Sequence, residues 1–198
     1  MLIAQNISFR YPEGNRLILD QFSISLPPGG RVGLLAPSGF GKTTLCQVLA
    51  GYVKPDTGTV LLDGQPLAAF SGPCPVQMVW QHPELVVNPR LRMRDVLAEA
   101  GPLDGHILPA LGIEPAWLAR FPGELSGGEL QRFCIARALG QHTRFLLADE
   151  ISTMLDLVTQ AQIWRFLLDE LDRRGIGLLA VSHDAPLLSE VCTEIITL

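Results

Sequence analysis

A lysine and two threonines follow a pair of glycines near residue 40. The segment Gly39-Phe40-Gly41-Lys42-Thr43-Thr44 comes after a short apolar run and opens a stretch of helical composition. In such a turn the backbone N–H groups converge on phosphate oxygens, and the positive end of the helix dipole adds to the attraction. Lys42 would supply a full charge to the β- and γ-phosphates, and the Thr43 hydroxyl suits Mg²⁺. The loop therefore predicts binding of a magnesium–nucleotide complex.

This loop departs from the strict phosphate-loop pattern G-x-x-x-x-G-K-[S/T] at its first position, where Ala36 stands. The bulky Phe40 is a second unusual residue. By composition alone, Gly-Lys-[Ser/Thr] arises by accident in roughly one chain in ten of this length. A plain strand-to-helix turn therefore stays open for the loop taken alone. Ala36 would matter if its position required a positive φ.

Two carboxylates follow the apolar run Phe145 to Ala148. In open α/β sheets ligands bind at the carboxyl ends of the strands, which is where Asp149 and Glu150 are expected. One carboxylate can hold Mg²⁺ through water, and its neighbour can polarise an attacking water. A strand end capped by solvated acids is the simpler alternative.

Alternating strands and helices must position these groups. A parallel sheet with right-handed crossovers is the fold that this alternation predicts. The expected strands are Leu2–Phe9, Leu17–Leu26, Arg31–Ala36, Thr59–Asp63, Val76–Trp80, Phe145–Ala148, Gly177–Ser182 and Glu194–Leu198. The expected helices are Thr43–Ala50 and Leu157–Arg174, and helical spacing also runs from Pro89 to about Gly140. A turn over Tyr11–Gly14 joins the first two strands.

Composition excludes several classes of protein. The chain has 198 residues, a formal net charge of −5, 47% hydrophobic and 18% charged residues, which indicates a globular domain. The acidic balance argues against a nucleic-acid partner, because such a partner requires clustered Lys and Arg. The four cysteines lack metal or redox spacing, and neither a signal peptide nor a membrane-length apolar run is present.

A five-residue string, Leu125-Ser126-Gly127-Gly128-Glu129, identifies the family. Followed by Leu130-Gln131-Arg132 and Ile135-Ala136-Arg137-Ala138-Leu139, it resembles the signature motif and helix of ABC (ATP-binding cassette) ATPases. Two glycines at a helix start expose N–H groups to a phosphate, beside a serine hydroxyl. The same residues can form a helix N-cap with a capping box, and both readings can hold together.

The resemblance runs the length of the chain and implies a fold. That fold is an α/β P-loop NTPase core, a parallel sheet flanked by helices, with an N-terminal antiparallel β subdomain and an inserted α-helical subdomain. We expect a single ABC ATPase domain over residues 1–198. Its nucleotide-binding core and β subdomain are expected at 1–88 and 141–198, and the helical subdomain with the signature motif at 89–140.

The resemblance also implies a role for each matching residue. Tyr11 matches the aromatic residue that stacks on adenine, and Gln81 the Q-loop glutamine that contacts Mg²⁺ or water. Asp149 matches the Walker B aspartate and Glu150 the catalytic glutamate. His183 matches the switch histidine at the γ-phosphate. Nucleotide contacts are expected from the phosphate loop, Pro37, Ser38, Gly39, Phe40, Gly41, Lys42, Thr43 and Thr44, and metal contacts from Thr43, Gln81 and Asp149. The segment Ser152 to Asp156 resembles the D-loop, with Leu155 and Asp156 as the matching pair.

In this family the signature of one subunit closes on the phosphate loop of a second. Ser126, Gly127 and Gly128 are therefore expected to contact a partner's ATP in trans. The implied partners are a second ABC ATPase subunit, identical or different, integral membrane permease subunits and a substrate-binding protein. The implied location is peripheral, at the cytoplasmic face of the cell membrane. ATP and Mg²⁺ are the expected substrate and metal.

The residues Gln81-His82-Pro83-Glu84 and Asn88-Pro89-Arg90 resemble the peptide/nickel import branch. Peptide importers often carry a C-terminal extension, whereas this chain ends at Leu198, which favours nickel or metal-chelate import. Two alternatives stay open. One is an ABC-type ATPase in a non-transport complex, and the other is a nucleotide-binding module with weak hydrolysis, which Ala36 and Phe40 would suggest.

Overall fold

A five-stranded parallel sheet forms the centre of the molecule. The computed structural model describes residues 1–12, 16–37 and 39–197. The strand order is β6-β7-β8-β3-β9, and all neighbouring strands are parallel. These strands are β3 (Arg31–Leu35), β6 (Val76–Val79), β7 (Phe145–Asp149), β8 (Gly177–Ser182) and β9 (Glu194–Thr197). β7 and β8 are buried over their whole length, as expected for apolar strands in a sheet covered on both faces.

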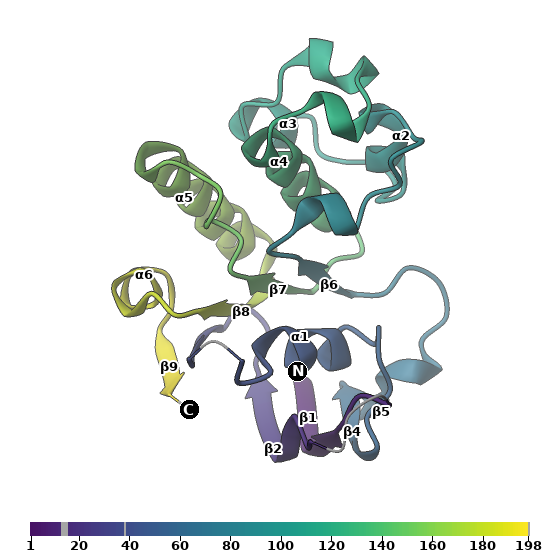
Figure 1. The fold of residues 1–198 in the computed structure, drawn as a ribbon, viewed down its shortest axis with the longest axis vertical. Helices are drawn as coiled ribbons and strands as arrows, with labels where there is room; N and C mark the ends of the chain where they lie inside the picture. The colour runs from purple at the N-terminus through teal and green to yellow at the C-terminus, as the bar shows by residue number, and fades with distance from the viewer. Residues whose placement is uncertain (13–15, 38, 198) are drawn as a thin grey trace.

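A smaller antiparallel sheet lies beside the central one, with the order β2-β1-β4-β5. Its strands are β1 (Leu2–Phe9), β2 (Leu19–Leu26), β4 (Thr57–Leu62) and β5 (Gln65–Pro66), followed by the 3₁₀ turn η1 (Leu67–Ala69). Helix α1 (Lys42–Leu49) lies between the two sheets (Figure 1). The apolar side of the small sheet and one face of the central sheet pack around α1 as one hydrophobic cluster.

Short helices connect β6 to β7 and gather at the end of the molecule far from the antiparallel sheet (Figure 1). They are η2 (Pro83–Leu85), α2 (Met93–Ala98), α3 (Ile107–Ala110), η3 (Pro115–Ala119), η4 (Pro122–Glu124) and α4 (Gly127–Ala138). Pro115 and Pro122 stand in the first turns of η3 and η4, where a missing N–H costs no helical hydrogen bond. We call this group of short helices the helical layer.

Two further helices, α5 (Leu157–Arg174) and α6 (Ala185–Val191), complete the fold. The Asp156 carboxylate accepts hydrogen bonds from the backbone N–H groups of Val158 and Thr159, which fixes the start of α5. Gly175, at φ +66°, ends that helix in the left-handed conformation. One hydrophobic cluster joins α5, the helical layer and the second face of the central sheet.

The fold class predicted from the sequence is confirmed, including the antiparallel sheet and the helical segment before β7. Strand ends differ from the expectation by one or two residues, and the two-residue strand β5 was not predicted. The division of the chain at residues 89 and 140 stays a prediction. Part of the expected turn after Tyr11, namely Glu13 and Gly14, lies outside the described residues. Among the residues that the structure describes, every helix is too short or too polar to cross a lipid bilayer.

Candidate active site

Four neighbouring strands of the central sheet end at one edge, and each is followed by a predicted site residue. β6 leads to Gln81, β7 ends in Asp149 and is followed by Glu150, and β8 leads to His183. β3 leads into the loop that begins at Ala36. Because parallel strands place their carboxyl ends together, residues from distant parts of the sequence meet here.

The glycine-rich loop has the backbone that a phosphate cradle requires. Gly39 and Gly41 have φ values of +80° and +92°. A Cβ on Gly41 would lie 2.7 Å from Ile18 Cγ2, so both the space and the conformation select glycine there. The Lys42 ammonium donates to the carbonyl oxygens of Ala36 at 2.9 Å and Pro37 at 3.1 Å. These bonds hold a 7% exposed lysine across the mouth of the loop.

The two unusual residues of the loop are accommodated without strain. Ala36 is buried and is not among the residues with positive φ, so its Cβ carries no backbone penalty. Phe40 is 40% exposed, so part of its bulk projects into solvent. Ser38, which was predicted to contact phosphate, lies outside the described residues.

Thr43 and Asp149 form the oxygen-rich part of the site. The Thr43 hydroxyl donates to Asp149 Oδ2 at 2.6 Å. Burial raises the pKa of the Asp149 carboxyl, and the bond from Thr43 partly offsets that rise. A buried carboxylate beside a hydroxyl is a hard-oxygen donor set, which fits Mg²⁺. The amide oxygen of nearby Gln81 can join the set.

Glu150 is the point at which three loops converge. One of its carboxylate oxygens, Oε1, lies 3.5 Å from Lys42 Nζ. The other, Oε2, accepts a hydrogen bond from Gln81 Nε2 at 3.2 Å and lies 3.3 Å from His183 Nδ1. Glu150 also has a φ of +49°, a strained value for a residue with a side chain. A largely buried carboxylate with these neighbours can act as a general base.

Tyr11 lies beside the start of α1. Its hydroxyl is 3.0 Å from Thr44 Oγ1 and donates to Gln47 Oε1 at 3.3 Å. The ring packs edge-on against Phe9 and is partly exposed. The link from Tyr11 to Thr44 was not predicted from the sequence. It places the aromatic ring next to the phosphate loop, and the exposed part of the ring could stack on a planar ligand.

The glycines of the Leu125–Glu129 string lie outside the cluster around Glu150. Ser126 caps α4 by accepting from the N–H of Glu129, and the Glu129 carboxylate accepts from the N–H of Ser126 at 2.7 Å, so the expected capping box is present. The structure does not bring these residues to Lys42. Instead, Ser126, Gly127 and Gly128 line a separate open groove together with Met154 and Leu155.

The D-loop limits what can stand at the two glycines. A Cβ on Gly127 would lie 3.1 Å from Met154 Sδ, and one on Gly128 would lie 3.2 Å from Leu155 Cδ2. Close approach of the D-loop is therefore a second reason for glycine here, beside exposure of backbone N–H groups. This contact could not be predicted from the sequence.

Sequence reasoning also missed two side chains of α4 that contact the segment carrying Gln81. Gln131 donates to the Trp80 carbonyl at 3.0 Å, and Arg137 donates to the Val86 carbonyl at 3.2 Å. The feature that sets Gln131 apart is that it is a polar side chain buried in a helix, which is uncommon. Its burial could not be read from the sequence.

Together these features define a class of protein. One edge of the parallel sheet carries a phosphate loop, an acidic pair, a glutamine and a histidine. A helix that begins with two glycines lies in the inserted helical layer. This combination is that of an ATP-binding cassette. The sequence profile described as ABC transporter matches residues 19–153. The chain therefore belongs to the ABC transporter family, of which it is an ATP-hydrolysing cassette.

Curated relatives agree with the branch expected from the sequence. The nickel import ATP-binding protein NikE of Rhodospirillum rubrum is 36% identical over 202 residues, which cover 92% of this chain and 73% of that protein. NikE of Escherichia coli O6:K15:H31 is 31% identical, covering 100% of this chain and 83% of that protein. A putative peptide import ATP-binding protein of Brucella abortus is 34% identical, with 94% and 63% covered. The predicted resemblance to peptide and nickel importers is confirmed.

Solved structures support the fold. The dimeric structure of MJ0796, a bacterial ABC transporter cassette, superposes with a TM-score of 0.85 and 24% identity, covering 100% of this chain and 94% of that one. A structure of an ATP-binding subunit of an ABC transporter has a TM-score of 0.85 and 21% identity, with 100% and 85% covered.

Proposed function

We propose that this chain hydrolyses ATP as one of two ATPase subunits of an importer and that Glu150 is the general base. The convergence of Lys42, Gln81 and His183 on the Glu150 carboxylate is the observation that carries the proposal. A carboxylate in a simple ion pair has one partner. The Glu150 carboxylate has three, from three different loops, and these contacts together fix its position, as expected for a catalytic group.

The phosphate loop is proposed to bind the triphosphate of ATP. Backbone N–H groups from Gly39 to Thr44 would face the phosphates, and Lys42 would add charge at the β/γ end. Lys42 now shares its ammonium between two carbonyls and Glu150. Phosphate oxygens are stronger acceptors than carbonyls, so substrate would draw the ammonium away from Glu150. Thr43, Asp149 and Gln81 would hold Mg²⁺, which neutralises charge on the phosphates when it is bound.

Hydrolysis is proposed to begin with Glu150 taking a proton from a water molecule aligned with the γ-phosphate. The water oxygen forms a bond to phosphorus as the bond to the leaving ADP oxygen breaks. The His183 ring and the Gln81 amide both lie at Glu150 Oε2 and would orient that water and the γ-phosphate oxygens. Neither side chain needs to travel far, because each already contacts the base.

The separation of the Ser126–Gly128 segment from Lys42 supports a two-subunit site. Backbone N–H groups at the start of α4 are suited to phosphate, yet they face a groove that lacks the lysine and the acidic pair. We propose that this groove closes over the ATP of a second ABC ATPase subunit, identical or different. Closure would exclude water from the phosphates and strengthen each electrostatic contact.

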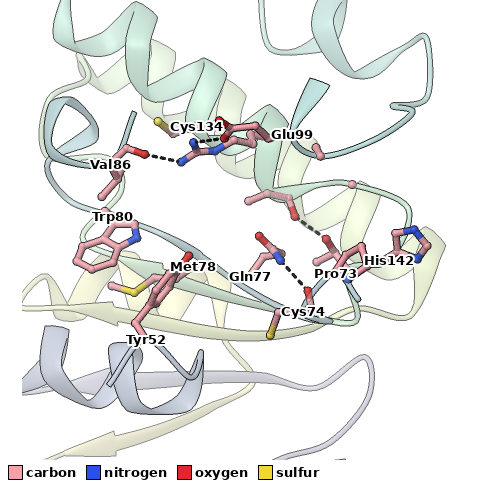
Figure 2. Close-up of a pocket in the computed structure, with 15 residues that line it drawn as sticks. Tyr52, Pro73, Cys74, Gln77, Met78, Trp80, Val86, Glu99, Cys134 and His142 are labelled. Carbon is pink, nitrogen blue, oxygen red and sulfur yellow. Dashed lines mark hydrogen bonds and ion pairs between the residues drawn. The ribbon is translucent and has the colours of Figure 1, made fainter. Parts of the chain in front are cut away.

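A cavity of about 370 Å³ between the central sheet and the helical layer is proposed to receive a permease subunit. Tyr52, Trp80 and Val86 line it (Figure 2), and the neighbouring Leu85 side chain is 76% exposed. Exposed apolar and aromatic side chains around a hollow are typical of a docking surface. Trp80 immediately precedes Gln81, so a permease bound here would contact the residue next to the one that hydrogen-bonds Glu150.

The importer is proposed to work at the cytoplasmic face of the cell membrane, with permease subunits and a substrate-binding protein. Nickel or a metal chelate is the proposed cargo and peptides are the alternative, because the curated relatives named above import nickel or peptides. The cargo is proposed to bind the permease and the substrate-binding protein and not the ATPase site. The substrate must therefore be identified with the permease and the binding protein present.

Phosphate release by the purified chain, measured alone and together with its partner ATPase and permease in proteoliposomes, tests the proposal. We expect slow release by the isolated chain, rising steeply with protein concentration, and further stimulation in the full assembly. Release that stays at background under all these conditions would contradict ATP hydrolysis by this chain. Nickel or peptide uptake that depends on ATP inside the vesicles identifies the cargo.

A further inference from the structure

Two side chains of helix α4 hydrogen-bond to the segment from Trp80 to Val86, one at each end of that segment. Gln131 Nε2 donates to the Trp80 carbonyl at 3.0 Å, and Arg137 Nη2 donates to the Val86 carbonyl at 3.2 Å. Figure 2 shows the second bond as a dashed line, with Trp80 and Cys134 near it on the same side of the cavity. Gln81 lies inside the segment, one residue beyond Trp80.

The Gln131 contact is unusually specific for a buried side chain. Gln131 is 1% exposed, and only its NH₂ group can donate to a carbonyl, so the orientation of the amide is determined. Its Oε1 atom is buried and meets no donor among the residues that the structure describes. A side chain retained only for packing would not need an amide there, because an unpaired buried acceptor is unfavourable.

Arg137 anchors the other end of the segment and joins it to α2. Its Nη1 atom pairs with Glu99 Oε2 at 3.1 Å, and Glu99 directly follows α2. Hydrogen bonds from a guanidinium are directional, unlike the apolar contacts that α4 also makes with its surroundings. The segment is therefore fixed to α4 in register, and sliding of one past the other would break both bonds.

The same helix begins with the signature glycines. Ser126 caps α4, and Gln131 lies five residues further on, about 7.5 Å along the helix axis. From Gln131 the connections run to the Trp80 carbonyl, to Gln81 in the next peptide, and then to Glu150 Oε2 at 3.2 Å. Each step is one hydrogen bond or one peptide unit.

We infer that Gln131 and Arg137 are positioning residues for hydrolysis. They make the Trp80–Val86 segment move together with α4, so that a shift of the signature end of α4 changes the position of Gln81 at Glu150. The inference rests on the proposed function, since it requires that Gln81 and Glu150 serve hydrolysis.

The variant Gln131→Met tests the role. Methionine has a similar volume and removes the unpaired Oε1, which offsets part of the cost of leaving the Trp80 carbonyl without its donor, so we expect at most a small fall in melting temperature. ATP affinity of the chain should also be unchanged, because the phosphate loop is intact. We expect kcat of the assembled ATPase to fall roughly tenfold. Gln162→Met makes the same chemical change at an exposed position of α5 and should behave as wild type.

A double variant locates the effect. If Gln131 acts through Gln81, Gln131→Met should cause no further loss of turnover when Gln81→Ala is already present. A wild-type kcat in Gln131→Met, or a loss that parallels a fall in melting temperature, would overturn the inference. Independent, multiplied losses in the double variant would overturn it as well while leaving the proposed function intact.

Gln81→Ala and Arg137→Lys provide two further tests of the inference. Wild-type turnover in Gln81→Ala alone would overturn the assigned role of Gln81, and this inference with it. Should Gln131→Met not fold, Arg137→Lys takes its place, because lysine keeps the charge facing Glu99 and loses the second donor to Val86. We expect Arg137→Lys to lower kcat at unchanged ATP affinity, and unchanged kcat would overturn the inference.

Discussion

The Lys42 ammonium lies 3.5 Å from Glu150 Oε1, so the phosphate-binding charge and the carboxylate after β7 are in direct contact. Both side chains are almost completely buried, and in such surroundings an ion pair is screened little by solvent. On the proposed function, substrate phosphates would compete with Glu150 for the ammonium. Binding of ATP and release of the proposed base would thus be linked by one cation.

A matched pair of threonine variants tests the proposed metal ligands. Thr43→Val removes the hydroxyl that donates to Asp149, whereas Thr43→Ser keeps it. We expect Thr43→Val to lower turnover by about two orders of magnitude and to raise the Mg²⁺ concentration needed for half-maximal rate. Thr43→Ser should stay near wild type. Magnesium titrations of phosphate release measure both, and equal magnesium requirements in the two variants would contradict the assignment.

Gly128→Ala separates helix stability from function. Alanine is favoured over glycine within a helix by about 1 kcal/mol, but the new Cβ would lie 3.2 Å from Leu155 Cδ2. We expect little net change in the free energy of unfolding and a clear fall in turnover, since the D-loop and the signature glycines must then move apart. Denaturant unfolding and phosphate release on the same sample check this. Full activity in Gly128→Ala would show that the close approach is not needed.

The buried carboxylate of Glu170 joins α5 to the helical layer through charged side chains that are themselves partly exposed. Its carboxylate accepts two bonds from Arg173 and lies 3.0 Å from His106 Nε2. Asp104, His106 and Glu170 bring three possible metal-ligand atoms together. However, Arg173 donates to both carboxylates, so the negative charges are already compensated. We interpret the group as a structural link.

This network predicts a pH dependence of stability. Burial alone would raise the pKa of Glu170, but hydrogen bonds from Arg173 and His106 hold it below its usual value. A lowered pKa in the folded state stabilises the protein above the unfolded pKa of about 4.3, and that stabilisation is lost as the pH falls through the folded pKa. Glu170→Gln should therefore be less stable than wild type at pH 7 by about 2 kcal/mol.

The difference between wild type and Glu170→Gln should narrow as the solution is acidified, because the carboxylate becomes protonated and loses its advantage over the amide. Urea unfolding at neutral and acidic pH measures it. Asp169→Asn, at an exposed position of the same helix, is the matched control and should show little effect at either pH. A stability difference that is independent of pH would contradict the charge network as its cause.

The fold and most of the cluster around Glu150 could be predicted because the signals are local. Apolar strands, glycines at a turn and acids at a strand end each depend on neighbours in sequence. The strand order then brings Gln81, Glu150 and His183 together. The resemblance to ABC ATPases supplied their order along the chain.

Other features could not be predicted because they depend on side chains that meet across the fold. The Gln131 bond to Trp80 and the Arg173 bonds to Asp104 and Glu170 join residues whose types are common on any helix. No local pattern distinguishes such a residue from a solvated one. The positive φ of Glu150 is likewise set by tertiary context, as strain at an active site generally is.

The central claim is that Glu150 is the base for ATP hydrolysis, and Glu150→Gln tests it most directly. Glutamine keeps the shape of the side chain but cannot accept the proton of the attacking water. We expect ATP binding to persist and single-turnover hydrolysis to fall by about two to four orders of magnitude, with an ATP-dependent dimer accumulating. Hydrolysis at the wild-type rate in Glu150→Gln, with ATP binding intact, would contradict the account.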